Sequence, residues 1–566
     1  MWTFPFISAF TSAELMSYAT KEVLGAFLVV FSMLLLLSWH SGKKKNKTSQ
    51  GSADSDQSKI SMMVLTACKF CHLFYGRHLN PPTAEYSVTA QSASNIYVVE
   101  TCLPGNRQNN PSLQEEPEVI IVGAGVLGAA MAALLARDGR KVVLIERDMT
   151  PPDRFAGELL QPGGLRLLKE MKLEDTVEGL DAQILYGFLI NEVDTNILLD
   201  ITFPEDEKKE VICGRTLHNG RFVNGLRKAA LAEPNVKLIE GTASTILQEG
   251  NRVIGVEYKD KETGQLKEVY AGLTVVADGL FSNFRKTLGP SKYQTKSHYA
   301  GFVIRDCPAF RKDKAEYILA NKNLLIVYQI STNETRVLVD IKGEMPKNLK
   351  EYMTEVICPQ LPDRIRDAFL NSVQTERLRS TPVGYMKPSY VDKPGVLMLG
   401  DAYNVRNPVT GAGMSVALND LKIWRSLLKN IPDLYSDGAM NKAKKKFHWL
   451  RKRNHSFVIN VLAEMIYDVF SASEGSVLKL RKAYFDYFQV GNPGTGPVEM
   501  LSILSPDPKK LMGHFLGAAL HAIRYAFKTE PWYLKPRALF KSSVLLFSGM
   551  SVIFPVMFSE MHTSVH

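Results

Sequence analysis

Six residues, Gly123-Ala-Gly125-Val-Leu-Gly128, have the types and spacing that bind a dinucleotide. They follow a β-branched run, Val119 to Val122, and Glu146 lies 18 residues beyond the last glycine. The first glycine permits a tight turn, the second admits a pyrophosphate close to the backbone, and the third lets a helix pack on a strand. A carboxylate at this distance can accept hydrogen bonds from ribose hydroxyls. The spacing predicts a dinucleotide site but does not separate FAD from NAD.

A second group of residues, far along the chain, favours a flavin. The apolar run Gly395 to Leu399 ends in Gly400-Asp401, and Pro408 and Gly411-Ala-Gly413-Met414 then open an apolar helix that extends to Trp424. Small residues let backbone N–H groups approach a flat ligand, and a helix N-terminus stabilises negative charge. A reduced flavin carries such charge, whereas a nicotinamide does not. The earlier pair Asp278-Gly279, which ends a strand expected at Leu273 to Ala277, indicates by itself only a turn.

Regular elements must hold these groups in place. The Ala- and Leu-rich segment Ala129 to Arg137 predicts a helix that ends at Gly139, and Lys141 to Ile145 predicts a second strand. Strand, glycine turn, helix, strand and acid in this order predict a Rossmann-like unit in an α/β fold. An ordinary βαβ unit without a ligand is the alternative.

Length and composition narrow the class of protein. The chain has 566 residues, 45% hydrophobic and 22% charged, with a net charge of +10. No basic run interleaved with aromatic residues resembles a nucleic-acid module, so a membrane surface explains the charge better and no nucleic acid is expected. Six cysteines form no dense disulfide framework. The pair Cys68 and Cys71 has redox or zinc spacing but no second pair beside it, and no metal site is expected.

The N-terminal 114 residues differ from the middle of the chain. Val23 to Trp39 is a run of 17 uncharged residues, followed by Lys43, Lys44, Lys45 and Lys47. As a helix this run would span about 26 Å, slightly less than a bilayer core of roughly 30 Å. The sequence predicts a membrane segment with a basic cytosolic flank over residues 1–47. Residues 48–114 lack periodicity and predict a disordered linker.

The C-terminal region also indicates a membrane. Leu511 to Ile523 carries no Lys, Arg, Asp or Glu, nor does Ser542 to Ser559, and the segment between them contains Trp532, Tyr533, Lys535 and Arg537. This order predicts a helical hairpin that dips into one leaflet, with its second helix broken at Pro555. A second full crossing, or helices that pack on the core, are the alternatives.

Several motifs together carry a family resemblance. GAGVLG followed by Glu146-Arg147, VVADGLFSNFRK and LGDAYNVRNPVTGAGM resemble flavoprotein monooxygenases of the p-hydroxybenzoate hydroxylase fold. PEVIIVGAGVLG, PDRFAGELLQPGG, DTVEGLDAQ, YKDKETG, TVVADGLFS and SVIFP are similar to the squalene monooxygenase (squalene epoxidase) family. The similarity extends from about residue 115 to the end of the chain.

The resemblance implies FAD as cofactor, a microsomal endoplasmic reticulum membrane with the catalytic domain facing the cytosol, and conversion of squalene to (3S)-2,3-oxidosqualene with O2. Electrons would come from NADPH through a separate microsomal flavoprotein reductase, since no second complete glycine motif is present for NADPH. A flavin-dependent hydroxylase or reductase that acts on another membrane lipid or prenyl substrate is the alternative, as is a membrane-tethered binding protein with a degenerate flavin site.

The family's site residues map onto this chain by position. The FAD contacts implied, with the three glycines of the turn, are Gly123, Gly125, Val126, Leu127, Gly128, Glu146, Arg147, Arg154, Leu159, Arg227, Ala243, Asp401 and Met414. The substrate pocket implied contains Phe188, Tyr328, Pro408, Phe470 and Phe485. No catalytic acid or base is expected, because the chemistry needs a dry, apolar pocket beside the flavin. Arg147 and Arg227 are also compatible with solvated surface positions.

The resemblance also implies the domain organisation. The FAD-binding domain is expected to be discontinuous, over 115–290 and 391–430, with a mixed-sheet substrate domain over 181–212 and 291–390 and a membrane-associated helical region over 431–566. Two departures from the relatives are visible. Gly187-Phe188 replaces a Gly-Tyr pair, which removes one hydroxyl from the pocket, and Asn407 to Gly413 replaces a His-Pro-Leu-Thr-Gly-Gly-Gly segment.

Overall fold

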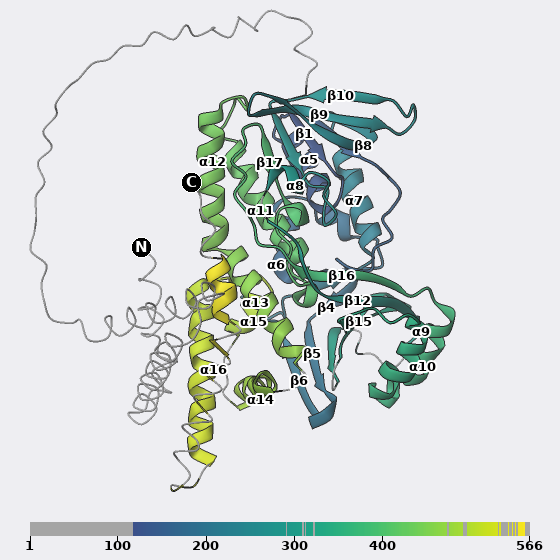
Figure 1. The fold of residues 1–566 in the computed structure, drawn as a ribbon, viewed down its shortest axis with the longest axis vertical. Helices are drawn as coiled ribbons and strands as arrows, with labels where there is room; N and C mark the ends of the chain where they lie inside the picture. Colours follow the sequence, from purple (N-terminus) through teal and green to yellow (C-terminus); the bar gives the residue numbers. More distant parts are fainter. Residues whose placement is uncertain are drawn as a thin grey trace, which may run out of the picture.

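The computed structural model describes residues 117–560 apart from 290, 308–310, 312, 321–322, 473–474, 491–494, 530, 532, 534–541, 543–545, 547–548 and 551–552 (Figure 1). The expected N-terminal membrane segment, the linker, and Cys68 and Cys71 lie outside the described residues. So does most of the expected hinge of the C-terminal hairpin, around Lys535 and Arg537.

The first sheet holds the glycine turn. Its seven strands have the order β10-β9-β8-β2-β1-β11-β17. Their bounds are β1 (Val119–Val122), β2 (Val142–Glu146), β8 (Val236–Glu249), β9 (Arg252–Asp260), β10 (Leu266–Tyr270), β11 (Leu273–Val276) and β17 (Val396–Met398). Strands β8, β2, β1, β11 and β17 are parallel neighbours. Every residue of β1 and β11 is buried, as expected of short apolar strands covered on both faces.

Helices cover this sheet closely. The bounds of the five that matter here are α5 (Val126–Arg137), α6 (Pro162–Glu170), α7 (Asn219–Leu231), α11 (Gly413–Leu428) and α12 (Asp437–Arg453). Helix α5 begins three residues before the expected start at Ala129, because the glycine turn leads directly into it. All of its residues from Leu127 to Ala136 are buried. The small alanine side chains let neighbouring backbones approach closely on every side.

A second sheet forms the lower layer in Figure 1. Its order is β16-β12-β15-β14-β13-β5-β6. The bounds are β5 (Gly187–Glu192), β6 (Ile197–Thr202), β12 (Gln294–Arg305), β13 (Lys314–Leu319), β14 (Leu324–Ser331), β15 (Glu334–Lys342) and β16 (Arg379–Tyr385). A small third sheet, β3-β7-β4, is formed by β3 (Leu159–Leu160), β7 (Gly214–Thr216) and β4 (Gln183–Leu185).

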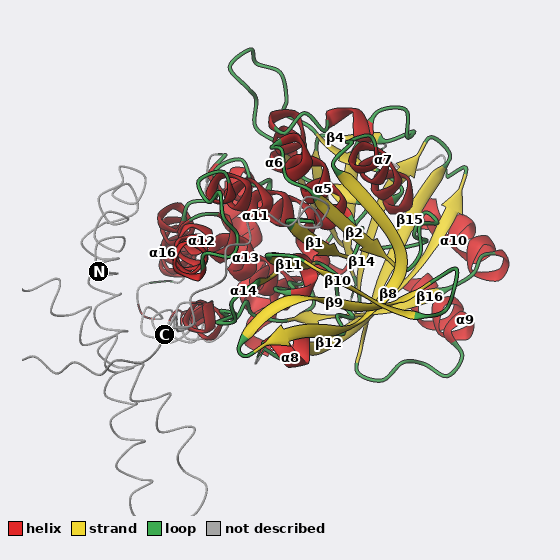
Figure 2. Ribbon diagram, turned by 90° about the horizontal axis from the view of Figure 1, so that it is seen from above, coloured by secondary structure: helices red, strands yellow, loops and turns green. Residues whose placement is uncertain are grey.

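The two faces of the second sheet bury different cores. One face packs against α10 (Asp363–Thr375) and against residues of and near α9 (Leu349–Tyr352). The other face packs against α13 (His455–Phe470), α14 (Gly475–Val490) and α15 (Gly496–Leu501). Figures 1 and 2 both place α9 and α10 on the opposite side of the molecule from α12 and α16 (Pro508–Thr529).

The C-terminal helices differ in one respect from the expectation. The described residues 549–550 and 553–560 are helical, so Pro555 lies within helical structure and the prediction of a break there is wrong. Ile553, Val556 and Met557 pack against the core on the α13 face of the second sheet, which holds this segment in place. Among the described residues, none of the helices combines the length and the apolarity that a membrane crossing needs.

Candidate functional site

The site forms where parallel strands end at one edge of the first sheet. Val122, the last residue of β1, pairs with Val276 at the end of β11, and Val276 pairs with Met398 at the end of β17. Adjacent strands lie about 4.8 Å apart, so the segments that follow them meet at this edge. These segments begin with Gly123, Ala277-Asp278 and Leu399-Gly400-Asp401. A Cβ atom on Gly400 would lie 3.9 Å from the Cβ of Leu127, so the glycine turn and the Asp401 segment are direct neighbours.

Each glycine of the turn has the role that its position predicts. Gly123 has φ of +99°, and a Cβ there would lie 2.6 Å from the carbonyl oxygen of Ala277. A Cβ on Gly128 would lie 1.9 Å from the carbonyl oxygen of Gly123. Gly125 differs from both, because a Cβ there would meet nothing within 4 Å. The turn thus leaves open space at the one position where a pyrophosphate must approach the backbone, and a dinucleotide fits it.

Glu146 and Arg227 support this turn from the side. The carboxylate of Glu146 accepts a hydrogen bond from the backbone N–H of Ala124 at 2.7 Å. Arg227 is 4% exposed and donates to the carbonyl oxygens of Ala124 at 2.8 Å and Thr150 at 3.0 Å. Its Nη2 also lies 3.5 Å from Glu146. Arg227 is therefore not a solvated surface residue. Its contacts fix the position of the turn relative to the carboxylate of Glu146.

The other arginines and Asp278 lie around the same edge. Arg147 and Arg154 are exposed, and a Cβ on Gly279 would lie 3.9 Å from the Arg154 guanidinium. Arg285, which comes from the same VVADGLFSNFRK motif, donates to the carbonyl oxygen of Asp401 at 2.9 Å. Burial raises the pKa of the Asp278 carboxyl, which accepts from the backbone N–H of Asn283 at 3.0 Å. Arg285 also donates to the carbonyl oxygen of Gly279 at 3.1 Å, so it ties the Asp-Gly turn after β11 to the Asp401 segment.

The remaining predicted cofactor residues are apolar and buried. Leu159, Ala243 and Met414 are each 7% or 8% exposed. Leu159 lies directly beside Gly411, where a Cβ would approach its side chain to 2.7 Å. Met414 is in the first turn of α11, whose leading N–H groups have no partner within the helix. Leu159 and Met414 thus lie beside the segment that follows Asp401, whereas Ala243, on β8, packs into the core of the first sheet.

One polar side chain at this site was missed by the sequence reasoning. Gln161 is fully buried and donates from Nε2 to the carbonyl oxygen of Thr410 at 2.6 Å. Its Oε1 has no partner in the structure, nor do the side chains of Asn407 at Nδ2, Thr410 at Oγ1 and Ser415 at Oγ. Buried polar atoms without partners are rare, so these four mark a place that suits a polar ring system such as a flavin. In the sequence, the position of Gln161 inside the GELLQPGG motif was the signal that could have identified it.

A line of aromatic rings runs from the second sheet into the helical region. Phe188 lies 5.4 Å from Phe203 and 5.7 Å from Tyr317, measured between ring centroids. Tyr317 lies 5.7 Å from Phe470, which lies 6.3 Å from Phe485. All four contacts are edge-to-face, a favourable arrangement. The structure therefore brings three of the predicted pocket residues into one apolar cluster.

Tyr317 is the link that the sequence reasoning missed. Its hydroxyl donates to the carbonyl oxygen of Val409 at 2.6 Å, in the turn Pro408–Thr410 that follows the Asp401 segment. Burial raises the pKa of this hydroxyl, so it stays protonated as a donor. Tyr317 thus joins the aromatic cluster to the turn Pro408–Thr410. In the sequence, only the apolar and aromatic character of the strand KAEYIL pointed to Tyr317.

The two other predicted pocket residues lie differently. Tyr328 is buried, and its hydroxyl donates to Glu158 at 3.0 Å, while Arg336 donates to both carboxylate oxygens of Glu158 at 2.8 Å. The Tyr328 hydroxyl is therefore committed to a buried charged pair. Pro408 is exposed at the start of its turn, unlike its buried neighbours.

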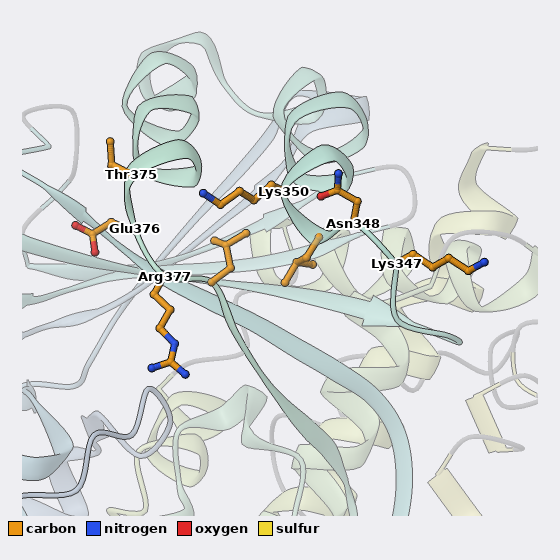
Figure 3. A pocket seen from close by; sticks show the side chains of 8 residues that line it. Lys347, Asn348, Lys350, Thr375, Glu376 and Arg377 are labelled. Atoms are coloured by element: carbon orange, nitrogen blue, oxygen red, sulfur yellow. The ribbon is translucent and has the colours of Figure 1, made fainter.

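Figure 3 shows a hollow in a different part of the molecule, between the start of α9 and the end of α10. It is lined by Lys347, Asn348, Leu349, Lys350, Thr375, Glu376, Arg377 and Leu378. This lining is open and largely charged, so it does not suit a hydrocarbon, and it shares no residue with the strand edge. Within the residues that the structure describes, no group of His, Cys, Asp or Glu side chains could hold a metal ion.

Comparisons with known proteins agree with this geometry. The family model described as squalene epoxidase matches residues 270–540, and that of an NAD(P)-binding Rossmann-like domain matches residues 121–151. The chain is 49% identical to squalene monooxygenase of Mus musculus, over the full length of both proteins. It is 38% identical to squalene epoxidase 3 of Arabidopsis thaliana, over 78% of this chain and 84% of the plant protein.

Solved structures show the same fold at low sequence identity. p-Nitrophenol 4-monooxygenase PnpA from Pseudomonas putida has a TM-score of 0.58 and 17% identity, over 70% of this chain and 98% of its own. The flavin-dependent brominase Bmp2 has a TM-score of 0.54 and 15% identity, over 73% of this chain and 100% of its own.

Proposed function

The chain belongs to the squalene epoxidase family, and on that premise we propose that it converts squalene to (3S)-2,3-oxidosqualene with O2 in sterol biosynthesis, using FAD. One observation in the structure carries this proposal: the ends of β1, β11 and β17 meet at one edge, and the loop that follows β17 is joined to a buried aromatic cluster by the hydrogen bond from Tyr317 to Val409. A single flavin dinucleotide can occupy that edge and present its ring system to an apolar chamber.

The residues at the edge have separable roles in holding FAD. Gly125 admits the pyrophosphate, and Glu146 accepts from the ribose hydroxyls. The N-terminus of α11 at Gly413 and Met414 would hold the ring system and would stabilise negative charge on it. When bound and reduced, FAD would supply the electrons that reduce one oxygen atom of O2 to water while the other atom enters the product.

The protein contributes to the oxygen transfer by positioning the substrate and by excluding water from the site. Squalene carries no polar group, so its binding depends on apolar contact with residues such as Phe188, Phe470 and Phe485. Exclusion of water protects the activated oxygen and holds a terminal double bond at reacting distance. No side chain is assigned as a catalytic acid or base.

Electrons come from NADPH through a separate flavoprotein reductase. The basic face of α12, formed by the exposed residues Lys442, Lys445, Lys446 and Arg453, suits an acidic partner. Trp449, which is 40% exposed, lies on the same helix. The last turn of α12 contacts the segment after Asp401, since Arg451 donates to Asn404 at 2.8 Å. A donor docked on α12 is therefore close to the flavin edge.

Charge reversal tests this docking surface. Lys445→Glu with Lys446→Glu is expected to slow reduction by the reductase several-fold at low ionic strength, and the difference should shrink as salt is added. Reduction by dithionite should not change. Lys347→Glu, on the opposite side of the molecule, serves as the control. Equal reductase kinetics for all three proteins would place the docking surface elsewhere.

The enzyme acts at the endoplasmic reticulum membrane, with its catalytic domain facing the cytosol. A C30 hydrocarbon partitions into lipid, so it must enter from the bilayer. Support comes from the uncharged run Val23 to Trp39 with its following lysines, and from α16, where Met512 and Phe515 are only partly buried against the core. Fractionation of cells and protease protection of the tagged full chain test this assignment. Recovery in a soluble fraction would contradict it.

Incubation with squalene is the direct test of the activity. The detergent-solubilised protein receives squalene, FAD, NADPH and a microsomal flavoprotein reductase under 18O2. One labelled oxygen atom should appear in the terminal epoxide. Label in a hydroxylated prenyl lipid, or formation of an unlabelled reduced prenyl lipid, with no label in oxidosqualene, would favour the alternative substrate class. A purified protein that stays colourless after FAD addition would favour a binding protein with a degenerate flavin site.

A further inference from the structure

Glu560, near the C-terminus, is a buried carboxylate that the proposed chemistry does not use. It is 0% exposed and ends the described helical residues 553–560. One oxygen, Oε1, accepts from the hydroxyl of Tyr385 at the end of β16 and from Asn460 Nδ2 on α13 at 3.0 Å. The other, Oε2, has no hydrogen-bond partner in the structure. The last described helix is therefore attached to both the second sheet and α13.

The residues that precede Glu560 in the same helix are apolar and pack against the core. Met557 is 3% exposed and belongs to the core that contains Phe188, Phe470 and Phe485. Ile553, Phe554 and Val556 pack against that core with partial burial. Residues 553–557 thus cover part of the apolar core on this face of the second sheet, while Glu560 at the end of the segment enters a polar cluster.

That polar cluster leads to the flavin-facing loop. Asn460 donates to the side-chain oxygen of Asn404 at 3.1 Å and accepts from Arg406 Nε at 3.0 Å. The same oxygen of Asn404 also accepts from Arg406 at 2.7 Å and Arg451 at 2.8 Å. Asn404 and Arg406 lie between Asp401 and the loop that opens α11, and Arg406 reaches the carbonyl oxygen of Gly413 at 3.5 Å. Two hydrogen bonds therefore connect Glu560, through Asn460, to the side chains of Asn404 and Arg406.

Energetics argue that this carboxylate does more than fill space. Burial of a carboxyl group costs free energy and raises the pKa of Glu560, and a well-packed apolar residue at such a position is often neutral or stabilising. A helix that only covered the core would be at least as stable without Glu560. The hydrogen bonds to Tyr385 and Asn460 instead fix the position of the helix relative to the loop.

We propose that Glu560 is a positioning residue, which couples the placement of the C-terminal helix over the substrate chamber to the placement of the flavin-facing loop 401–407. The role of this coupling in epoxidation rests on the proposed function, whereas its effect on FAD binding does not. When the helix is seated, the loop is held for the cofactor and the chamber is shielded from water. When Glu560 is replaced, the helix and the loop are both held less firmly.

Three variants of the full chain test the coupling. Glu560→Met keeps the volume and removes the acceptor, Glu560→Gln keeps an acceptor for both donors, and Glu178→Gln makes the same chemical change at an exposed site. FAD affinity is measured by fluorescence titration of flavin-stripped protein, and oxidosqualene formed per NADPH consumed is measured with the reductase.

Glu560→Met is expected to raise the Kd for FAD about fivefold to tenfold, which corresponds to the loss of roughly one buried hydrogen bond, and to lower the product per NADPH. Glu560→Gln should recover most of both effects, and Glu178→Gln should match the wild type. A folded Glu560→Met protein with Kd within about twofold of wild type and unchanged product per NADPH would overturn the proposal, even with a lower Tm.

A further variant covers the case in which Glu560→Met does not fold. Tyr385→Phe removes one donor and leaves the carboxylate, so a smaller shift of about twofold to threefold in Kd is expected in the same direction. No shift would overturn the coupling. Failure of the wild type to form oxidosqualene would refute the proposed function instead, since the FAD titrations contain no squalene.

Discussion

Substitution of Gly125 by alanine is expected to change the stability of the protein and its affinity for FAD in opposite directions. Gly125 has φ of −77° and ψ of −167°, a conformation open to alanine, and its Cβ would meet nothing within 4 Å. Replacement of glycine by alanine in a compatible conformation reduces the entropy of the unfolded chain. The protein without cofactor is therefore expected to gain about 0.4–1 kcal/mol in its free energy of unfolding.

The effect on the cofactor has the opposite sign. The added methyl group fills the space that the pyrophosphate needs and moves it away from the backbone N–H groups of the turn. Hydrogen bonds to charged groups contribute roughly 1.5–3 kcal/mol each. Loss of one such bond raises the Kd for FAD about tenfold to hundredfold.

Urea unfolding of the flavin-stripped protein and fluorescence titration with FAD measure the two effects separately. Gly139→Ala is the matched control, because Gly139 also has free space for a Cβ but has φ of +90° and lies at the far end of α5. It should lower stability by about 1 kcal/mol and leave the Kd unchanged. A Gly125→Ala protein that binds FAD as tightly as the wild type would refute the placement of the pyrophosphate.

Three other substitutions test the supports of the site. Arg227→Met leaves the carbonyl oxygens of Ala124 and Thr150 without their donor, so the free energy of unfolding should fall by about 2–4 kcal/mol; an unchanged urea midpoint would contradict this role. Phe470→Ala interrupts the aromatic line and should cost about 3–5 kcal/mol in stability and raise the KM for squalene in the folded fraction, whereas an unchanged KM would remove Phe470 from the pocket. Burial raises the pKa of Asp278 above its ordinary 3.8, so the folded state holds this proton to higher pH than the unfolded chain. The stability contribution is complete below 3.8 and is lost as pH rises through the folded pKa, so Asp278→Asn should lose less stability than wild type as pH rises above 3.8, and parallel stability curves would contradict the shift.

The sequence by itself determined the local elements and their chemistry. The run Val119 to Val122, the three glycines and Glu146 predicted a strand, a turn and an acid, and the structure confirms the strand and the roles of the glycines in packing. The strands at 273–276 and 396–398 and the helix that opens at Gly413 are also confirmed. These features follow from short-range physics, because glycine geometry, β-branched runs and helix starts depend on neighbours within a few residues.

The tertiary structure alone decided which distant residues meet. The adjacency of β1, β11 and β17, the hydrogen bond from Tyr317 to Val409, and the contacts of Gln161 and Glu560 join residues that are tens to hundreds of positions apart. No periodicity reports such pairs, since a buried glutamine or glutamate looks like a surface residue in the sequence. Arg227 shows the same limit, because only the packing of α7 against the glycine turn distinguishes a buried support from a solvated arginine.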